Sequence, residues 1–196
     1  MWLKKIELES ETVKLVPLRK DHADDLVKAA SDGKLWELWY TSIPNAESID
    51  EYISKALKEQ VQGTALAFVI IEKNSNKIIG STRFCHADKV HQRVEIGYTW
   101  YAESYQRSFV NTECKQLLLS HAFEARGAIA VEFRTHWHNL KSRAAILRLG
   151  AKQDGVLRNH QKMAKGVYRD TVVFSIINTE WPVVKVSLDH KLAKFR

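Results

Sequence analysis

The chain has 196 residues, of which 45% are hydrophobic and 27% charged, and its formal net charge is +7. This composition is typical of a globular protein and excludes a disordered or fibrous chain. We therefore expect one domain, residues 1–196, with one substantial core. No apolar run approaches the roughly 18 residues of a membrane-spanning helix, so a membrane protein is excluded.

The two cysteines, Cys85 and Cys114, are too few for a disulfide framework, and the first residues lack the apolar segment of a secretory signal. We therefore expect a cytoplasmic protein. Lysines and arginines are mixed with acidic residues and form no dense basic block, so a nucleic-acid partner is not expected. A small ligand that carries phosphates suits the positive charge equally well.

The first third of the chain predicts a strand and two helices. Residues 12–18 alternate apolar with other side chains and include β-branched residues, which is typical of a strand. The segment 21–31 has carboxylates in its first turn and predicts a short helix. Ser48 and Glu51 have the spacing of a capping box, so a second helix is predicted to run to about Gly63.

After residue 64 the pattern changes to short apolar runs. Residues 64–71 and 78–84 flank a polar turn, which predicts a hairpin, and residues 94–101 predict another strand. We expect these strands to form an antiparallel meander.

A helix, a strand and a helix follow in the sequence pattern. Residues 111–125 have helical apolar spacing, residues 129–135 predict a strand, and residues 140–149 predict a helix that ends at Gly150. The candidate N-caps are Asn111 or Thr112 for the first helix and Asn139 for the second. This succession predicts a parallel crossover and a sheet that helices cover.

The last part predicts a second hairpin and a helix. Its strands are residues 156–163 and 168–177, its turn is 164–166, and the helix starts at Thr179 and Glu180. The fold class is therefore mixed α/β.

This order of elements resembles the GNAT acyltransferase superfamily, and five sequence words agree with the branch that includes the ribosomal-protein N-terminal acetyltransferases. The words extend over nearly the whole chain and are LVPLRKDHADDL, VEIGYTWY, YQRSFVNTECKQLLLSHAFE, FRTHWHNLKSRAAILRLGAKQDGVLRNH and YRDTVVFSIINTEW. The resemblance implies acetyl-CoA as donor and an amine as acceptor. It also implies a mostly antiparallel central sheet with a parallel, splayed pair of strands and helices on both faces.

The family has a pyrophosphate loop that aims backbone amides and a helix N-terminus at phosphate oxygens. The corresponding residues here are Gln106, Arg107, Ser108, Phe109, Val110, Asn111 and Thr112. The family normally has small residues where this chain has Phe109 and Asn111, and the Phe109 side chain would hinder the cofactor unless it points away from it. Arg107, Ser108 and Asn111 offer additional donors to phosphate.

The resemblance also implies that the strand at 94–101 parts from the strand at 129–135. The pantetheine arm of the cofactor then enters the gap and uses free backbone groups, as an added strand would. An amide of Ile96, Gly97 or Tyr98 is expected to polarise the thioester carbonyl. Gly97 fits a bulge or a close backbone approach, although glycine is also tolerated in plain strands.

Asn139 and Ser142 match the family's Asn-x-x-Ser, whose side chains contact the pantetheine or the sulfur in relatives. Many members carry a tyrosine later in this helix that protonates the departing thiolate, but this chain has Ile146 there. We therefore expect Ser142 to orient or protonate the thiolate. A thiol with an ordinary pKa of about 8.5 is a tolerable leaving group without a strong acid.

Direct attack on a thioester requires a neutral amine, and at pH 7 roughly one α-amine in six is neutral, against about one lysine side chain in 2,500. The candidate bases are Glu95, on the cofactor-facing strand, and His160, which has a suitable ordinary pKa. Their structural alternatives are an ion pair of Glu95 with Arg83 or Arg93, and a surface position for His160.

Other groups have structural explanations that we favour. His136 and His138 could bind a metal only with a third ligand from elsewhere, so no metal site is predicted. Cys114 has apolar helical neighbours and is expected in the core. Three aromatic residues either line an acceptor pocket or plug the core: Trp36, Trp39 and Tyr40.

The sequence therefore predicts an acetyl-CoA-dependent N-acetyltransferase that acts on a primary amine, on a protein N-terminus or a small molecule, by direct attack in a ternary complex. The alternative is an inactive CoA-binding regulatory module of the same fold, because Phe109, Asn111 and Ile146 depart from the family pattern. We expect neither a nucleic-acid nor a membrane partner. Exposed edge strands would also allow a homodimer.

Overall fold

A computed structural model describes residues 2–163 and 166–194 of the chain. In this part of the chain the strands are β1 Leu8–Glu9, β2 Val13–Pro17, β3 Leu66–Glu72, β4 Lys77–Asp88, β5 Arg93–Tyr101, β6 Ala130–His136, β7 Lys152–Lys162 and β8 Tyr168–Ile177. The α-helices are α1 Ala23–Ser31, α2 Ile49–Val61, α3 Val110–Ser120, α4 Leu140–Arg148 and α5 Trp181–Ala193. A π-helical turn, His121–Ala125, continues α3.

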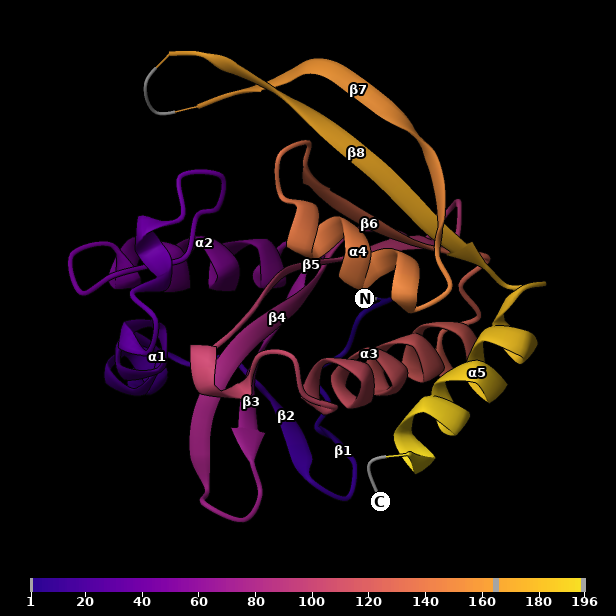
Figure 1. Cartoon of the computed structure of the whole chain (residues 1–196), viewed down its shortest axis with the longest axis horizontal. Coiled ribbons are helices and arrows are strands. Elements are labelled where there is room, and N and C mark those ends of the chain that lie inside the picture. The colour runs from indigo at the N-terminus through magenta and orange to yellow at the C-terminus, as the bar shows by residue number, and fades with distance from the viewer. Residues whose placement is uncertain (1, 164–165, 195–196) are drawn as a thin grey trace.

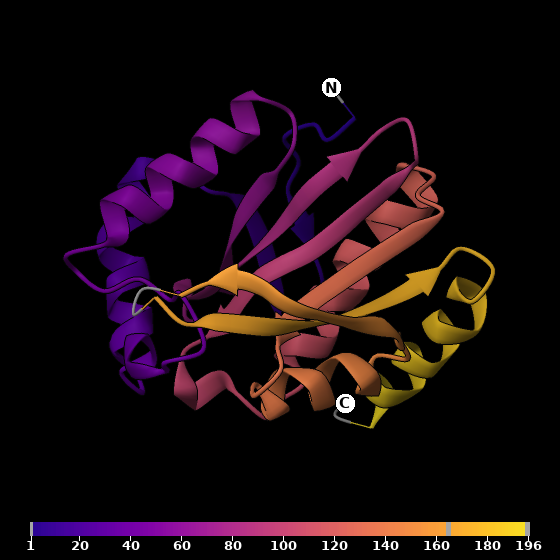
Figure 2. The same ribbon diagram turned by 90° about the horizontal axis from the view of Figure 1, so that it is seen from above.

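The strands form one sheet in the order β1-β2-β3-β4-β5-β6-β8-β7, with β5 and β6 as the parallel pair of the described strands. Helices α1 and α2 lie on one face, and α3 and α5 on the other (Figures 1 and 2). The predicted mixed α/β fold with a mostly antiparallel sheet is confirmed. None of the described helices is long and apolar enough to cross a membrane.

Two hydrophobic clusters fill the two sides of the sheet. Along β5, Val94 and Ile96 join the larger cluster beneath α3, whereas Trp100 joins the cluster beneath α1 and α2. Side chains of a strand alternate between its two faces, so Val94 and Ile96 share one face, whereas the even-numbered Trp100 lies on the other because a bulge between Gly97 and Trp100 shifts the alternation by one residue. The odd-numbered residues Glu95 and Gly97 therefore lie on the α2 face.

The parallel pair is joined over only three residues of each strand. Arg93–Glu95 of β5 pair with Ala130–Glu132 of β6, and the pairing then ends although both strands continue. Beyond this point β5 stays paired with β4, and β6 stays paired with β8 up to His136. The two strands therefore separate and leave a wedge between them. This agrees with the splayed parallel pair that the family resemblance implies.

A bulge distorts β5 beside this wedge. Gly97 pairs with Arg83 and Trp100 with Ser81, so β5 contains one residue more than β4 between these pairs. Tyr98 lies in this extra length with φ of 50°, in the left-handed region. An extra residue of this kind leaves backbone groups outside the ladder and redirects neighbouring side chains.

Some element boundaries differ from the predictions. Helix α3 starts at Val110 with Phe109 as N-cap, so the predicted caps Asn111 and Thr112 are wrong, because tertiary partners occupy both side chains. Ser48 is the N-cap of α2 but hydrogen bonds to Asn45 instead of forming a capping box. Strand β7 starts at Lys152, four residues before the predicted 156. In the predicted turn 164–166, residues 164–165 lie outside the described chain.

Candidate functional site

The loop before α3 presents backbone donors at a helix N-terminus. Within the described chain, no acceptor is found for the amides of Ser108, Asn111 and Thr112. Arg107 has φ of 59°, and a left-handed residue beside helical ones makes successive amides converge on one side. This arrangement suits a phosphate group.

The side chains of this loop have protein partners of their own. Phe109 is half-buried and packs against the larger hydrophobic cluster, and Ser108 Oγ accepts a hydrogen bond from the Val110 amide at 3.3 Å. Asn111 accepts a hydrogen bond from the Tyr101 hydroxyl at 3.2 Å, and Gln106 donates to the Tyr101 carbonyl. Arg148, near the end of α4, donates to Thr112 Oγ1 at 3.0 Å and brings a further cation to the start of α3.

Glu95 lies at the closed end of the wedge. Its side chain is 8% exposed, and Oε2 is 2.9 Å from His86 Nδ1 and 3.4 Å from Arg134 Nε. The hydrogen bond to Glu95 raises the pKa of His86 against the opposing effect of burial. The sequence alternatives Arg83 and Arg93 are wrong as partners, because they pair with glutamates other than Glu95.

The other carboxylate oxygen of Glu95 lies over Gly97. A Cβ atom at Gly97 would lie 2.9 Å from Glu95 Oε1 and 3.2 Å from Cys85 Sγ. The residue therefore has to be glycine for the carboxylate to approach the backbone this closely. A carboxylate is thus held directly beside the bulge and the opening of the wedge.

The register of β5 and β6 brings two glutamates and two arginines together at the closed end of the wedge. Glu95 and Glu132 stand opposite each other across the parallel pair, where like charges repel. Arg134 contacts both carboxylates, and Arg93 donates two hydrogen bonds to Glu132. Burial alone would raise the pKa of Glu132, but the hydrogen bonds from Arg93 and Arg134 hold it below its ordinary value.

The other residues that the sequence analysis singled out belong to helix α4 and its N-cap, and to strand β7. Asn139 caps α4 as predicted, because its Oδ1 accepts from the Ser142 amide at 3.0 Å. Ile146 is buried in the larger cluster and offers no proton donor. His160 is an exposed residue of β7 that hydrogen bonds to Thr171 Oγ1 at 3.1 Å. The catalytic roles of Ser142 and His160 stay predictions.

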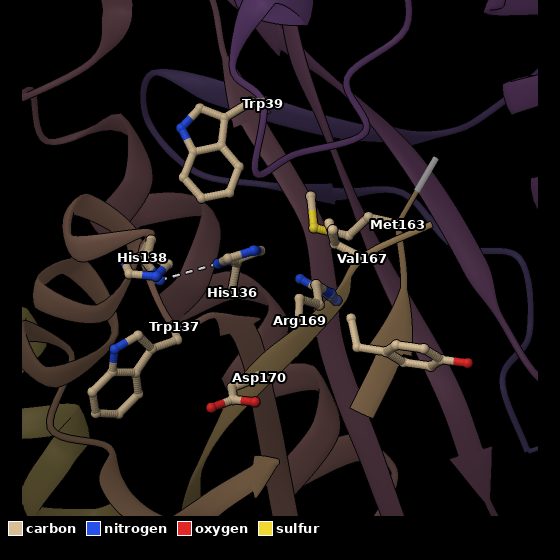
Figure 3. A pocket seen from close by; sticks show the side chains of 9 residues that line it. Trp39, His136, Trp137, His138, Met163, Val167, Arg169 and Asp170 are labelled. Atoms are coloured by element: carbon tan, nitrogen blue, oxygen red, sulfur yellow. Dashed lines mark hydrogen bonds between the residues drawn. The ribbon is translucent and has the colours of Figure 1, made fainter. Parts of the chain in front are cut away.

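A cavity of about 260 Å³ opens beneath the tip of the β7–β8 hairpin (Figure 3). Its residues come from three places: the connection between α1 and α2, the end of β6, and the hairpin. They are Trp39, His136, Trp137, His138, Met163, Val167, Tyr168, Arg169 and Asp170. Three aromatic residues were expected either to line an acceptor pocket or to plug the core. Trp39 lines the cavity, the Tyr40 ring packs edge-on against the Trp39 ring, and Trp36 packs on the core beneath α1 and α2.

The comparison with family models agrees with this geometry. The model described as "Acetyltransferase (GNAT) domain" matches residues 12–152, which is more than half of the chain. The chain belongs to the GNAT acetyltransferase family. It is therefore an N-acetyltransferase of that family, in which acetyl-CoA is the acetyl donor.

Similar proteins extend over most of the chain. The N-acetyltransferase p20 of Bacillus licheniformis is 26% identical over 178 residues, which are 89% of this chain and 97% of that protein. The structure of a GCN5-related N-acetyltransferase from Brucella melitensis has a TM-score of 0.85 at 27% identity and covers 97% of this chain and 86% of that one. RimL, a ribosomal L7/L12 alpha-N-protein acetyltransferase solved with coenzyme A, shares the fold at 19% identity, with a TM-score of 0.73 and coverage of 88% and 98%.

This GNAT acetyltransferase also has a buried lysine that the sequence analysis missed. Lys115 of α3 is 5% exposed, and Nζ lies 2.5 Å from Thr99 Oγ1 and 3.5 Å from Thr82 Oγ1. Desolvation lowers its pKa to about 7. The hydroxyl of Thr99 also reaches the Gly97 carbonyl, so Lys115 braces the bulge from the α3 face. The sequence does contain a signal for this burial: Lys115 lies at helical spacing from Thr112 and Leu119, which are both buried.

Three ligand-type atoms meet beside Gly97, although the sequence predicts no metal site. They belong to Cys85, His86 and Glu95 and lie within 4.8 Å of one another. The Arg134 guanidinium already provides a positive charge beside the same carboxylate, and burial raises the pKa of the Cys85 thiol well above its ordinary value. Both features oppose binding of a cation, so the absence of a metal stays our prediction. Cys114 is fully buried in the core, as expected.

Proposed function

We propose that this enzyme transfers the acetyl group of acetyl-CoA to a primary amine by direct attack within a ternary complex. The observation that carries the proposal is the juxtaposition of the wedge, the bulge and one carboxylate. Strands β5 and β6 part after Glu95 and Glu132, and Glu95 Oε1 lies over Gly97 at that point.

The wedge and the loop before α3 have complementary tasks in this proposal. The free amides of Ser108, Asn111 and Thr112 bind the pyrophosphate, helped by the cations of Arg107 and Arg148. The unpaired edge of β5 binds the pantetheine arm, and the backbone of Ile96, Gly97 and Tyr98 faces the thioester. Supporting this assignment, RimL was solved with coenzyme A in the same fold.

Glu95 is proposed to act as the general base. Its Oε1 takes the proton of the attacking amine, directly or through water, while Oε2 stays paired with His86 and Arg134. The nitrogen bonds to the acetyl carbon, the carbon–sulfur bond breaks, and the thiolate leaves with Ser142 as its nearest proposed donor. An ordinary thiol pKa of about 8.5 makes this departure feasible although Ile146 replaces a tyrosine.

The test is the pH profile of the Glu95→Gln variant. We expect kcat to fall about 100-fold, within the contribution of general-base catalysis, with little change in the KM for acetyl-CoA. His160→Gln is the matched variant for the second candidate base and should keep most of the activity. An unchanged profile in Glu95→Gln would exclude Glu95, and a collapsed profile in His160→Gln would transfer the role to His160.

A further inference from the structure

The cavity of Figure 3 is lined by Arg169, for which the described part of the chain provides no acidic partner within ion-pair distance. Arg169 is half-buried, and its Nε donates to the neutral amide oxygen of Gln161 at 2.9 Å. No ion pair of Arg169 is found among the described residues. Asp170, which also lines the cavity, is already bound by Arg158 and by the Asn159 amide. The cavity wall therefore contains a guanidinium that no described carboxylate contacts directly.

A second donor without a partner lies beside this guanidinium. His136 Nδ1 accepts a hydrogen bond from the His138 amide at 3.0 Å (Figure 3). Burial and the neighbouring Arg169 both lower the pKa of His136, so the ring is neutral and carries its proton on Nε2. This Nε2 is buried and has no hydrogen-bond partner among the described residues. Buried donors left without an acceptor are uncommon and costly.

Arg169 connects the cavity to the bulge. Its guanidinium lies within electrostatic reach of Tyr98 and Glu95, while burial lowers its pKa. The aromatic rings of Trp39, Trp137 and Tyr168 supply apolar walls. The cavity volume of about 260 Å³ is close to the lower end, roughly 300 Å³, of sites for small molecules.

Building on the acetyl transfer proposed above, we propose that Arg169 and His136 bind the carboxylate of a small amino-acid-like acceptor. The acceptor is a primary amine that also carries a carboxylate and an apolar or aromatic body. Gln161 takes two of the five N–H donors of Arg169, which leaves three for the acceptor. The aromatic walls contact the body, and the amine lies toward Glu95. This wall selects for an acceptor with both charges and against a simple amine.

The experiment compares tryptophan with tryptamine, which share the amine and the indole and differ in the carboxylate. We measure kcat/KM for both in the wild type, Arg169→Gln, His136→Gln and the matched control Lys162→Gln, an exposed charge of the same hairpin outside the cavity wall. The ratio of tryptophan to tryptamine activity should fall about 10- to 100-fold in Arg169→Gln, because a hydrogen-bonded charge is lost. It should fall less in His136→Gln and stay unchanged in Lys162→Gln.

The ratio cancels the different intrinsic reactivity of the two amines and any general loss of active protein. An equal fall for both amines in Arg169→Gln would overturn the proposal. So would activity on other amines or on peptide N-termini without any activity on amino acids. A changed KM for acetyl-CoA in Arg169→Gln would assign the guanidinium to the cofactor and would also overturn it.

A binding measurement separates this inference from the proposed reaction. N-acetyltryptophan and N-acetyltryptamine, each with CoA, are titrated calorimetrically into wild type and Arg169→Gln. Tighter binding of the carboxylate compound by the wild type only would support the subsite even if no turnover were found. If neither compound binds but other amines are acetylated, the subsite fails and the acetyl transfer stands.

Discussion

Gly97 is the residue where backbone geometry and chemistry meet. The carboxylate of Glu95 and the thiol of Cys85 both approach the position that a Cβ would occupy there. Gly97 does not adopt a positive φ, so its backbone conformation does not demand glycine. The close approach of the two side chains does. The same contact places a carboxylate oxygen over the backbone beside the opening between β5 and β6.

Gly97→Ala should therefore damage activity more than stability. The added methyl must displace Glu95 Oε1, and overpacking of this kind costs about 1–3 kcal/mol. We expect kcat to fall at least about tenfold while the free energy of unfolding decreases within that range. Gly155→Ala in β7, where a Cβ would meet no atom within 4 Å, is the matched control. Full activity of Gly97→Ala would show that Glu95 tolerates displacement and would count against its role as base.

At the scale of elements, the two helices beside the wedge begin in different ways. Helix α4 is capped by its N-cap side chain, whereas the N-cap Phe109 of α3 makes no such bond; Ser108 Oγ accepts from the Val110 amide, and no acceptor is found in the described chain for the Asn111 and Thr112 amides. The orphan amides of a helix start must be satisfied by a side chain, water or a ligand. The start of α4 is thus occupied by Asn139, and the start of α3 is available for phosphate.

Substitutions of Asn139 separate its structural and functional roles. Asn139→Ala should lower the free energy of unfolding by about 1 kcal/mol, because the cap on the Ser142 amide is lost. Asn139→Asp keeps the cap and should keep the stability, measured by denaturant unfolding. If the side chain also contacts the cofactor, Asn139→Asp will raise the KM for acetyl-CoA although it is stably folded. Equal destabilisation in both variants would contradict the capping role.

At the scale of the whole molecule, one sheet separates two tasks. In the proposed reaction the loop before α3, where Arg148 of α4 contacts Thr112, binds the anionic donor, and the acceptor enters from the α2 face and the hairpin, where Glu95 and the cavity lie. We propose that the two substrates meet at the opening between β5 and β6. Lys115 is buried beneath the bulge, and the lowering of its pKa to about 7 reflects the cost of burying its charged form.

Lys115 makes the stability of the whole chain depend on pH. Its pKa is about 7 in the folded protein against 10.5 for an ordinary lysine, so between these values the unfolded chain binds the extra proton. The free energy of unfolding therefore rises with pH above 7 in the wild type. Between pH 7 and 8.5 we expect a gain of about 1–2 kcal/mol relative to Lys115→Met.

Parallel denaturant titrations of the two proteins check this prediction, because the other groups that titrate in this range contribute equally to both. Parallel pH dependences in the wild type and Lys115→Met would mean that Lys115 stays charged in the fold. Retained cooperativity in the variant is the control for correct folding.

Local pattern was sufficient for much of the fold. Apolar periodicity predicted the meander 64–101, helix α4 with its Asn139 cap, and the second hairpin, because each of these depends on residues close together in the chain. The succession of strand and helix predicted the parallel crossover, and the family resemblance added that this parallel pair is splayed. Ser48 is the N-cap of α2 as predicted, but its hydroxyl bonds to Asn45 and forms no capping box, and the predicted caps of α3 were wrong because Tyr101 and Arg148 bind the side chains of Asn111 and Thr112.

The amino-acid pattern alone was enough to predict the order of elements, the family resemblance and Glu95 as a candidate base. The tertiary structure was needed to show that His86 and Arg134 flank this carboxylate, that Phe109 packs against the larger cluster, and that Arg169 forms no ion pair with a described acidic residue. Periodicity reports which face of an element is buried. It does not report which charges from distant strands meet there, because strand register and the parting of β5 from β6 set those distances.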